Sequence, residues 1–299
     1  MNIDIIDTAA DMTRVFDAAP EHRRDLIRHM WSPMVGMYHF IPGEIDMALI
    51  HQQNFGFPDS CPTEALREGL DALIQANAWG RMRHALERGV ESLKTANPDL
   101  CVPDLKVLLL LGDPANGHFM EEVQGLSAFG GISGYIAVTV WPTDEVLNRL
   151  EAIVVHELHH NVRYSPGGVV WDPATVTVGE HVVAEGLADI FATELYGQDG
   201  YTHFVDDHTR DDDRVLAKVT SGLQVTGMQD FAAWVLGDKI ARLFGADPVG
   251  LPTGAGYAAG VRLVGEYLRL HGGTAASNVH ALAATILSDV LPRLGLGNE

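Results

Sequence analysis

Cysteine is scarce in this sequence. Only Cys61 and Cys101 occur among the 299 residues, and they form no C-x-x-C motif. Small secreted domains that are held together by disulfides carry more cysteines than this for their length. The sequence therefore indicates a fold that does not depend on a disulfide framework.

Positive charge is also scarce. Lysine and arginine together number 20, against 40 aspartates and glutamates, which gives a formal net charge of −20. An electrostatic field of this sign opposes binding to DNA, RNA or an anionic membrane surface. We therefore expect neither a nucleic-acid partner nor a membrane partner.

Long apolar stretches are missing as well. No stretch reaches the roughly 18 apolar residues that suggest a membrane-spanning helix. Residues 1–7 lack the basic and apolar regions of a secretion signal. We expect a cytoplasmic protein.

The sequence does have enough hydrophobic residues for a large core, at 46% hydrophobic and 20% charged. Apolar and β-branched runs predict strands over residues 105–111 and 135–141. Helical periodicity, interrupted by prolines, predicts helices over residues 21–37, 63–76, 78–96, 214–223, 230–243, 257–271 and 277–291. We expect an α+β fold, mostly helical, with a small mixed sheet next to a pair of helices that carry the motifs described below.

The most informative motif lies at residues 156–160. His156, Glu157 and His160 form an H-E-x-x-H pattern. Residues four apart on an α-helix share one face, so both imidazoles can reach one ion. Glu157 lies about 100° further round the helix, where it can reach a metal-bound water and act as a general base. Zinc is the metal that this pattern indicates.

The residues before the motif predict a helix with one face in a core. Thr143 is a plausible N-cap, and acids follow it in the first turn, where the helix dipole favours them. Histidines and a glutamate on such a helix are costly to bury unless something satisfies them, and a metal would do so. The apolar residues with helical spacing are Val146, Leu147, Leu150, Ile153, Val154 and Leu158.

A catalytic zinc takes three protein ligands and keeps one position open. The metzincin extension of the motif requires a glycine and a histidine where this sequence has Arg163 and Pro166. Residues 179–196 instead predict a second helix, with Glu185 at its middle beside the apolar stripe. Asp189 follows one turn later on the same face, where it could accept the free ring N–H of a ligand histidine.

Three other polar residues compete for roles near this site. Glu180 is a rival third ligand, although an acid at a helix start ordinarily caps the helix or interacts with its dipole. His181 shares the face of Glu185 and could contact substrate, but an exposed histidine at a helix start is the simpler interpretation. His159 lies on another face of its helix, so we expect it in the core or beside the site.

These motifs carry a resemblance to a known class. An H-E-x-x-H helix followed by a helix with Glu-x-x-x-Asp is similar to the gluzincin zinc peptidases. The strings HELHHNVRYS and VVAEGLADIFATELYG resemble a bacterial family of predicted zinc-dependent proteases, and the likeness covers roughly residues 105–270. The second helix departs from the gluzincin pattern, because the asparagine often found next to the third ligand is absent.

The resemblance implies one zinc ion per chain, held by His156, His160 and Glu185. It also implies Glu157 as the base and Asp189 as the group that orients a histidine ligand. From this resemblance, together with the helical patterns on either side, we expect an N-terminal helical region (residues 1–100), a zincin-like catalytic core (101–200) and a C-terminal helical subdomain that closes the cleft (201–299).

A peptidase must also hold its substrate and stabilise an anionic tetrahedral species. The resemblance gives residues 133–139 the role of a strand at the cleft edge to which an extended peptide adds, whereas the sequence alone equally allows a core strand. Tyr257 is the first candidate donor to the anion, because small neighbours would let its helix approach a cleft closely. Half-buried packing is its alternative role. The other candidates are Arg262, Tyr164, Arg163 and His203.

The acidic run from Asp206 to Asp213 is expected to be a solvated loop, with a calcium site as the alternative. The function that the sequence favours is a zinc-dependent hydrolase that cleaves peptide bonds in a peptide or protein substrate. The alternatives are a zinc-binding regulatory or stress-related protein with little turnover, and a hydrolase of non-peptide amides.

Overall fold

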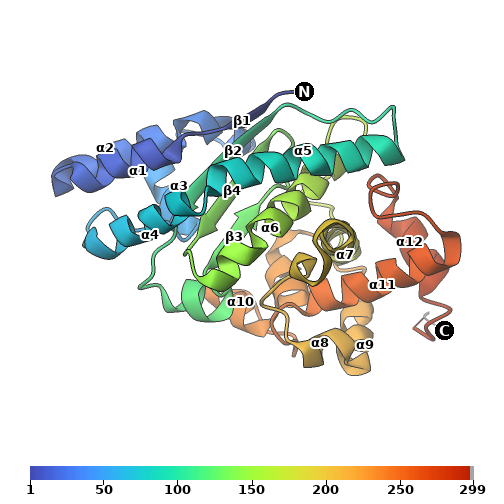
Figure 1. Cartoon of the computed structure of the whole chain (residues 1–299). Coiled ribbons are helices and arrows are strands. Elements are labelled where there is room, and N and C mark those ends of the chain that lie inside the picture. The colour runs from blue at the N-terminus through green and yellow to red at the C-terminus, as the bar shows by residue number, and fades with distance from the viewer. Residues whose placement is uncertain (297–299) are drawn as a thin grey trace. The chain divides into compact units, whose positions relative to one another are not determined.

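The computed structural model describes residues 1–296 of the chain. It contains two compact units, one formed by residues 1–90 and 101–161, the other by residues 91–100 and the chain from 162 onward. Helices predominate, and one small mixed sheet is present (Figure 1). The expected α+β class is confirmed. None of the helices in the described part of the chain is both long and apolar enough to cross a membrane.

The first unit contains the sheet, whose strands are β1 (Ile3–Ile5), β2 (Leu105–Leu111), β3 (Leu126–Phe129) and β4 (Tyr135–Val140). The strand order is β1-β2-β4-β3; β1, β2 and β4 run parallel, and β3 is antiparallel to β4. Every residue from Val107 to Leu111 is buried, as the apolar run predicts for a central strand. β4 is also an interior strand.

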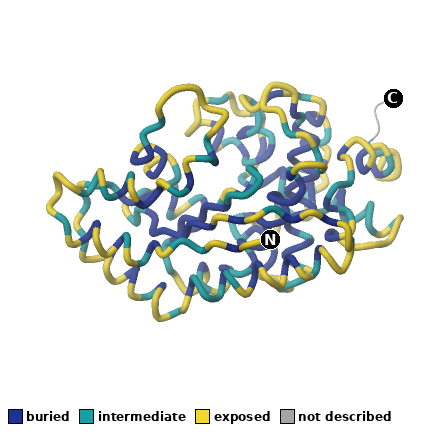
Figure 2. Tube along the Cα trace, turned by 90° about the horizontal axis from the view of Figure 1, so that it is seen from above, coloured by how far each residue is buried: buried dark blue, intermediate teal, exposed yellow. Residues whose placement is uncertain are grey.

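Helices surround the sheet within this unit, and α1 and α4 both pack against β2. Buried and exposed residues alternate along the outer helices, which is visible in Figure 2 as changes between dark blue and yellow. The helices before β2 are α1 (Thr8–Asp17), α2 (Pro20–Trp31), η1 (Ser32–Tyr38), α3 (Met47–Gln53), α4 (Glu64–Gln75) and α5 (Ala78–Ala96). A short π-helix, η2 (His118–Glu122), precedes β3, and α6 (Asp144–Arg163) follows β4.

The second unit is helical. Its central helix is α7 (Val178–Tyr196), in which every residue from Val178 to Asp189 is buried. α11 (Ala255–His271) packs along α7. The remaining elements are η3 (Gly197–Gly200), α8 (Asp207–Asp211), α9 (Asp213–Ser221), η4 (Met228–Asp230), η5 (Ala232–Leu236), α10 (Asp238–Leu243) and α12 (Ala283–Val290).

Two glycines allow α7 and α11 to approach unusually closely. A Cβ atom on Gly186 would collide with the backbone of Gly260, and a Cβ on Gly260 would collide with the carbonyl oxygen of Val182. Contact of backbone with backbone cannot be relieved by a change of rotamer. This crossing therefore fixes the position of α11 against the turn of α7 that carries Glu185.

Several predicted helices differ from the structure at their ends. The helix predicted over residues 21–37 ends at Trp31, because Pro33 lies in the next turn and the chain continues as the 3₁₀ helix η1. The helix predicted over residues 230–243 is broken at Gly237, whose φ of 97° is left-handed. The helix predicted over residues 277–291 begins only at Ala283.

The acidic run from Asp206 to Asp213 was expected to be a solvated loop, and this is wrong, because it forms α8 and the start of α9. Asp206 accepts a hydrogen bond from the backbone N–H of His208, and Asp212 accepts one from that of Arg214. Both acids are N-caps, which explains the dense aspartates without a bound ion.

Replacing Gly260 by alanine should lower the free energy of unfolding by about 1–3 kcal/mol, because the added methyl group meets the Val182 carbonyl. Gly265 on the same helix is the matched control, since a Cβ there meets no neighbouring atom within 4 Å. Gly265→Ala should raise the free energy of unfolding by up to about 1 kcal/mol. Urea unfolding of both variants makes the comparison, and equal stability would contradict the close approach of α7 to α11.

The stability of the first unit should also depend on pH through His51. This side chain is fully buried, accepts a hydrogen bond from Trp31 Nε1 at 3.0 Å through Nδ1, and donates from Nε2 to the Phe57 carbonyl at 2.9 Å. Burial lowers the pKa of His51 to about 4, from an ordinary value near 6.5. The folded state therefore holds the neutral imidazole. Its contribution to stability is complete above pH 6.5 and is lost as the pH falls toward 4.

We expect the free energy of unfolding, compared with that of a His51→Gln variant, to fall by on the order of 3 kcal/mol between pH 7 and pH 4. Denaturant unfolding at several pH values measures this difference. His22→Gln is the control, because His22 is exposed; its difference from the wild type should stay flat. If the difference in free energy of unfolding between the wild type and His51→Gln does not change with pH, the neutral, buried imidazole is contradicted.

Candidate metal centre

The H-E-x-x-H motif lies on α6, as predicted. Thr143 Oγ1 accepts a hydrogen bond from Val146 N at 3.2 Å and so caps the helix start. His156, Glu157 and His160 are all buried, with 4–7% of their surface exposed. The Nε2 atoms of the two histidines lie 3.0 Å apart, and their rings meet edge to face with centroids 4.7 Å apart. One helix thus brings two imidazole nitrogens to the same point.

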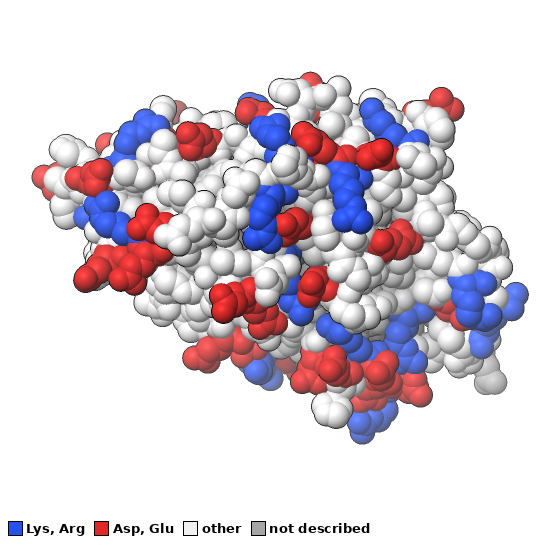
Figure 3. All heavy atoms as spheres, in the orientation of Figure 1, with Lys and Arg blue, Asp and Glu red and all other residues white. Residues whose placement is uncertain are grey.

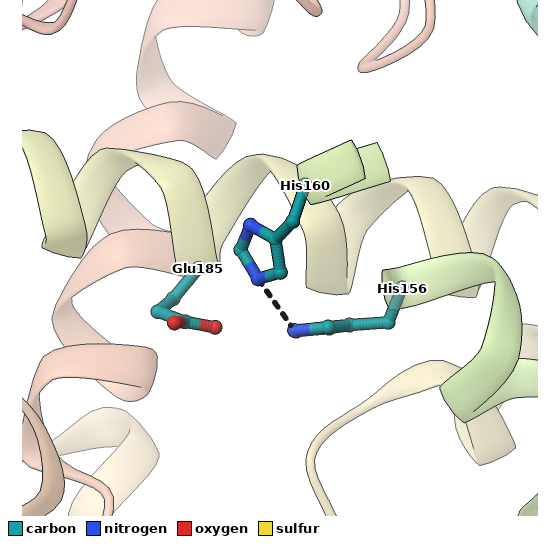
Figure 4. A group of neighbouring side chains, drawn as sticks. All are labelled: His156, His160 and Glu185. Carbon is teal, nitrogen blue, oxygen red and sulfur yellow. Dashed lines mark hydrogen bonds between the residues drawn. The ribbon is translucent and has the colours of Figure 1, made fainter. Parts of the chain in front are cut away.

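Glu185 completes a group of three possible ligands. It is 8% exposed and lies in the middle of α7. One ligand atom each from His156, His160 and Glu185 can be chosen so that all three lie within 4.8 Å of one another. Figure 4 shows the carboxylate of Glu185 and the two imidazoles pointing toward one another. The three side chains to which the sequence assigned one metal are therefore neighbours.

The donor set fits zinc. Two ligands bound at about 2.0–2.1 Å to a tetrahedral zinc ion lie about 3.3 Å apart, and the two Nε2 atoms are 3.0 Å apart. Two imidazoles and a carboxylate form the ligand set of many catalytic zinc sites. Within residues 1–296, no other cluster of three histidine, cysteine, aspartate or glutamate side chains has this proximity.

A loop between β3 and β4 is attached to α6 beside Glu157. Asn161 Oδ1 accepts from Gly134 N at 2.7 Å, and its amide nitrogen lies 2.7–3.0 Å from the carbonyls of Gly130, Ile132 and Tyr135. Gly130 passes so close to the Glu157 carbonyl that a Cβ atom would collide with it. Sequence reasoning missed Asn161. Its only signal in the sequence is an amide side chain directly after the motif.

The sheet topology corrects the expectation for residues 133–139. β4 pairs with β2 on one side and with β3 on the other, so this segment cannot be the edge strand of the sheet. β3 lies at the end of the sheet. Any peptide that extends the sheet on this side would therefore add to β3 (Leu126–Phe129).

Glu180, the rival third ligand, belongs to a buried ion pair. Arg163 is fully buried, and its Nε and Nη2 donate to the two carboxylate oxygens of Glu180 at 2.8 and 2.9 Å. Arg163 Nη1 donates to the carbonyls of Val279 and Ala281, both at 2.9 Å. Such a paired carboxylate has little capacity left for a metal.

Tyr164 joins the same ion pair. Its hydroxyl donates to Glu180 Oε1 at 3.1 Å. Burial and then the charge of Glu180 hold the pKa of Tyr164 well above its ordinary value. Arg163 and Tyr164 were candidate donors to the anionic species, but the structure commits both of them to Glu180.

Two further histidines lie near the motif helices. His159 is fully buried, in agreement with the expected core position. His181 was expected to be exposed, but this is wrong, because it is only 8% exposed and its ring lies 4.5 Å from that of Phe231. The segment that contains Phe231 covers the start of α7. No local sequence pattern indicates this contact.

Asp189 and Tyr257 line one cavity of about 390 Å³. Asp189 is buried and accepts hydrogen bonds from Thr202 Oγ1 at 2.8 Å and from Thr202 N at 3.4 Å. Tyr257 is half-buried and meets the ring of Phe204 edge to face at 5.5 Å. Arg262, another candidate donor, lines the same cavity, whereas His203 is not among its lining residues.

The buried ion pair predicts a large loss of stability in Glu180→Gln. This variant leaves the Arg163 guanidinium buried without its counter-charge, which should lower the free energy of unfolding by about 3 kcal/mol or more. Glu266→Gln is the matched control, because Glu266 also pairs with an arginine through both oxygens, but that arginine is 67% exposed. The control should lose at most about 1 kcal/mol. Thermal unfolding compares the two variants, and similar losses would refute the assignment.

Comparisons with known proteins identify a relative and a family for this chain. No solved structure is significantly similar to it. The uncharacterized protein YjfC of Bacillus subtilis (strain 168) is 28% identical over 298 residues, which cover 96% of this chain and 98% of that protein. Residues 78–288 match the family described as "Predicted Zn-dependent protease (DUF2268)". This match spans more than half of the chain and includes His156, His160 and Glu185, and the chain therefore belongs to that family.

Proposed function

We propose that the protein is a zinc-dependent hydrolase that cleaves peptide bonds. The observation that carries the proposal is the grouping of His156, His160 and Glu185, whose ligand atoms lie within 4.8 Å of one another. Glu157, adjacent to the first ligand in sequence, supplies a carboxylate that is not needed to hold a metal. A purely structural zinc site has four protein ligands and no use for such a base.

His156, His160 and Glu185 would hold the zinc ion. When bound, zinc polarises a carbonyl group and makes water more acidic, which is the chemistry that amide hydrolysis needs. All three side chains are buried; two belong to α6 and one to α7.

Glu157 acts as the general base. Its carboxylate takes a proton from the attacking water and later passes that proton to the leaving amine. The contact of Gly130 with the Glu157 carbonyl, and the four contacts made by Asn161, hold this turn of α6 against the loop between β3 and β4. Glu157 therefore has a rigid support.

Asp189 and Tyr257 have supporting roles in this proposal. Asp189 lies one turn after Glu185 on α7 and orients the ring of a ligand histidine through its free N–H. Tyr257 donates its hydroxyl to the oxygen that becomes negatively charged. Asp189 and Tyr257 line one cavity, and the close crossing of α7 and α11 holds their helices together.

The substrate is a peptide or a protein segment in extended conformation. β3 ends the sheet, and its backbone offers the row of donors and acceptors to which an extended peptide can add. Phe129, at the end of this strand, is 43% exposed and could contact a substrate side chain. The loop that carries Gly130 follows directly.

Two glutamates distinguish metal binding from catalysis. Glu157→Gln should retain bound zinc and lose about 10²–10⁴-fold in kcat, because only the base is removed. Glu185→Gln should lose zinc affinity itself, because one ligand is removed. Glu145→Gln is the control, since Glu145 is 58% exposed in the first turn of the same helix. Metal content and cleavage of a diverse peptide library measure these effects.

The outcomes separate the alternatives. Bound zinc without turnover of any peptide by the wild type would refute the peptidase proposal and favour a regulatory protein or a hydrolase of other amides. Full zinc content in Glu185→Gln would refute the third ligand. A folded wild type that binds no zinc at all would refute the metal assignment.

A further inference from the structure

Several residues that line the cavity beside Asp189 have no role in the reaction proposed above. It has a volume of about 390 Å³ and is lined by residues of α7, η3, α8 and α11 and of the segment between η3 and α8. Asp189 lies four residues after Glu185 on α7, a rise of about 6 Å. The cavity is therefore lined by the same helix that carries Glu185, one turn further along.

Two arginines line this cavity in a chain that is otherwise poor in positive charge. The guanidinium of Arg210 lies 4.8 Å from the centre of the Tyr201 ring, and its Nη1 is 3.5 Å from Asp207, whose side chain is 95% exposed. An ion pair this long and exposed contributes little free energy. Arg210 can therefore exchange Asp207 for a ligand anion at small cost.

Arg262 is only partly satisfied. Its Nη2 donates to Asp213 at 2.6 Å, but Asp213 is 88% exposed, so this pair is weak as well. Its Nη1 is buried and has no hydrogen-bond partner among the described residues. A buried donor without an acceptor is unfavourable. A small rotation of the guanidinium toward the cavity would allow a ligand carboxylate to satisfy it.

Asp189, Asp207 and Asp211 also line the cavity, and solvent screens the charges of those that are exposed. Asp207 and Asp211 are exposed to solvent, and Asp189 accepts two hydrogen bonds from Thr202. Figure 3 shows acidic and basic side chains intermingled at the lower edge of the molecule, where α8 and α9 lie in Figure 1. The remaining wall combines the polar side chains of Gln198 and Thr202 with the aromatic and apolar side chains of Tyr201, Val205, Tyr257, Ala258 and Val261.

We propose that this cavity binds a carboxylate group of the peptide substrate, with Arg262 as its main partner and Arg210 as the second. The planar guanidinium fork matches the two oxygens of a carboxylate, and the apolar wall accepts the carbon atoms that carry it. This inference rests on the proposed function, because it names the substrate class of that site. The carboxylate comes either from an aspartate or glutamate side chain or from the C-terminus of the peptide.

Peptide binding to the full-length, zinc-loaded Glu157→Gln protein tests the proposal without cleavage. The probes are fluorescent peptides in which glutamate is exchanged for glutamine at one position at a time, each with a free or an amidated C-terminus. The peptide whose carboxylate reaches the cavity should bind about 10- to 100-fold more tightly than the matched peptide in which that carboxylate is replaced by an amide. Loss of affinity on amidation identifies the C-terminus, and loss on exchange to glutamine identifies a side chain.

The arginine variants assign the preference to the cavity. Adding Arg262→Gln should abolish the difference between carboxylate and neutral peptides, and Arg210→Gln should reduce it. Arg262→Lys keeps the charge but not the fork, so it should retain part of the preference. Arg269→Gln is the matched control on α11, because Arg269 is 67% exposed and pairs with Glu266; the preference should remain. Thermal unfolding checks that each variant is folded.

Two results would overturn the subsite: equal affinity for carboxylate and neutral peptides, including no detectable binding of either, or a preference that survives in Arg262→Gln. If the wild type cleaves the library without any carboxylate preference, the subsite is refuted while the peptidase proposal stands. If it cleaves nothing but shows an Arg262-dependent preference in binding, the peptidase proposal is refuted while the carboxylate site stands.

Discussion

The burial of α7 on every side constrains the rest of the second unit. Every residue from Val178 to Asp189 is inaccessible or nearly so, and this stretch contains three carboxylates. A buried carboxylate must have a partner or lose its charge. Glu180 has Arg163, Asp189 has Thr202, and Glu185 lies beside two imidazoles. Each acid therefore lies beside a different group, and for Glu185 this group is the pair of imidazoles of His156 and His160.

Close packing explains how α7 holds its position. Gly186 directly follows Glu185, and at this point α7 touches the backbone of α11 at Gly260. Tyr257 and Arg262 lie on α11 on either side of that crossing, and both line the cavity that includes Asp189. The same small residues therefore hold the turn with Glu185 and the two cavity residues in place relative to one another. The parts of the cavity wall that α7 and α11 provide therefore cannot move independently of each other.

Local sequence patterns predicted much of the fold and of the candidate site. The periodic helix 78–96 and the apolar strand 105–111 were predicted at the residues where they occur, and the motif helix begins at the expected cap, Thr143. The rest depends on partners distant in sequence. The sequence did not reveal the ion pair of Arg163, because its partners Glu180 and Val279 lie 17 and 116 residues away. The burial of His181 likewise depends on Phe231, which no periodicity reveals.

The two carbonyl contacts of Arg163 also bear on how the protein is made. Arg163 stands directly after the turn that carries His160, yet its Nη1 donates to Val279 and Ala281, far toward the C-terminus. His280 makes a second connection there, with its ring nitrogen 2.9 Å from the Val162 carbonyl. On the ribosome, a chain that has not yet reached these residues leaves Arg163 Nη1 without its two carbonyl acceptors at the end of the motif helix. The end of that helix can therefore settle only after residues 279–281 have been synthesised and have packed against it.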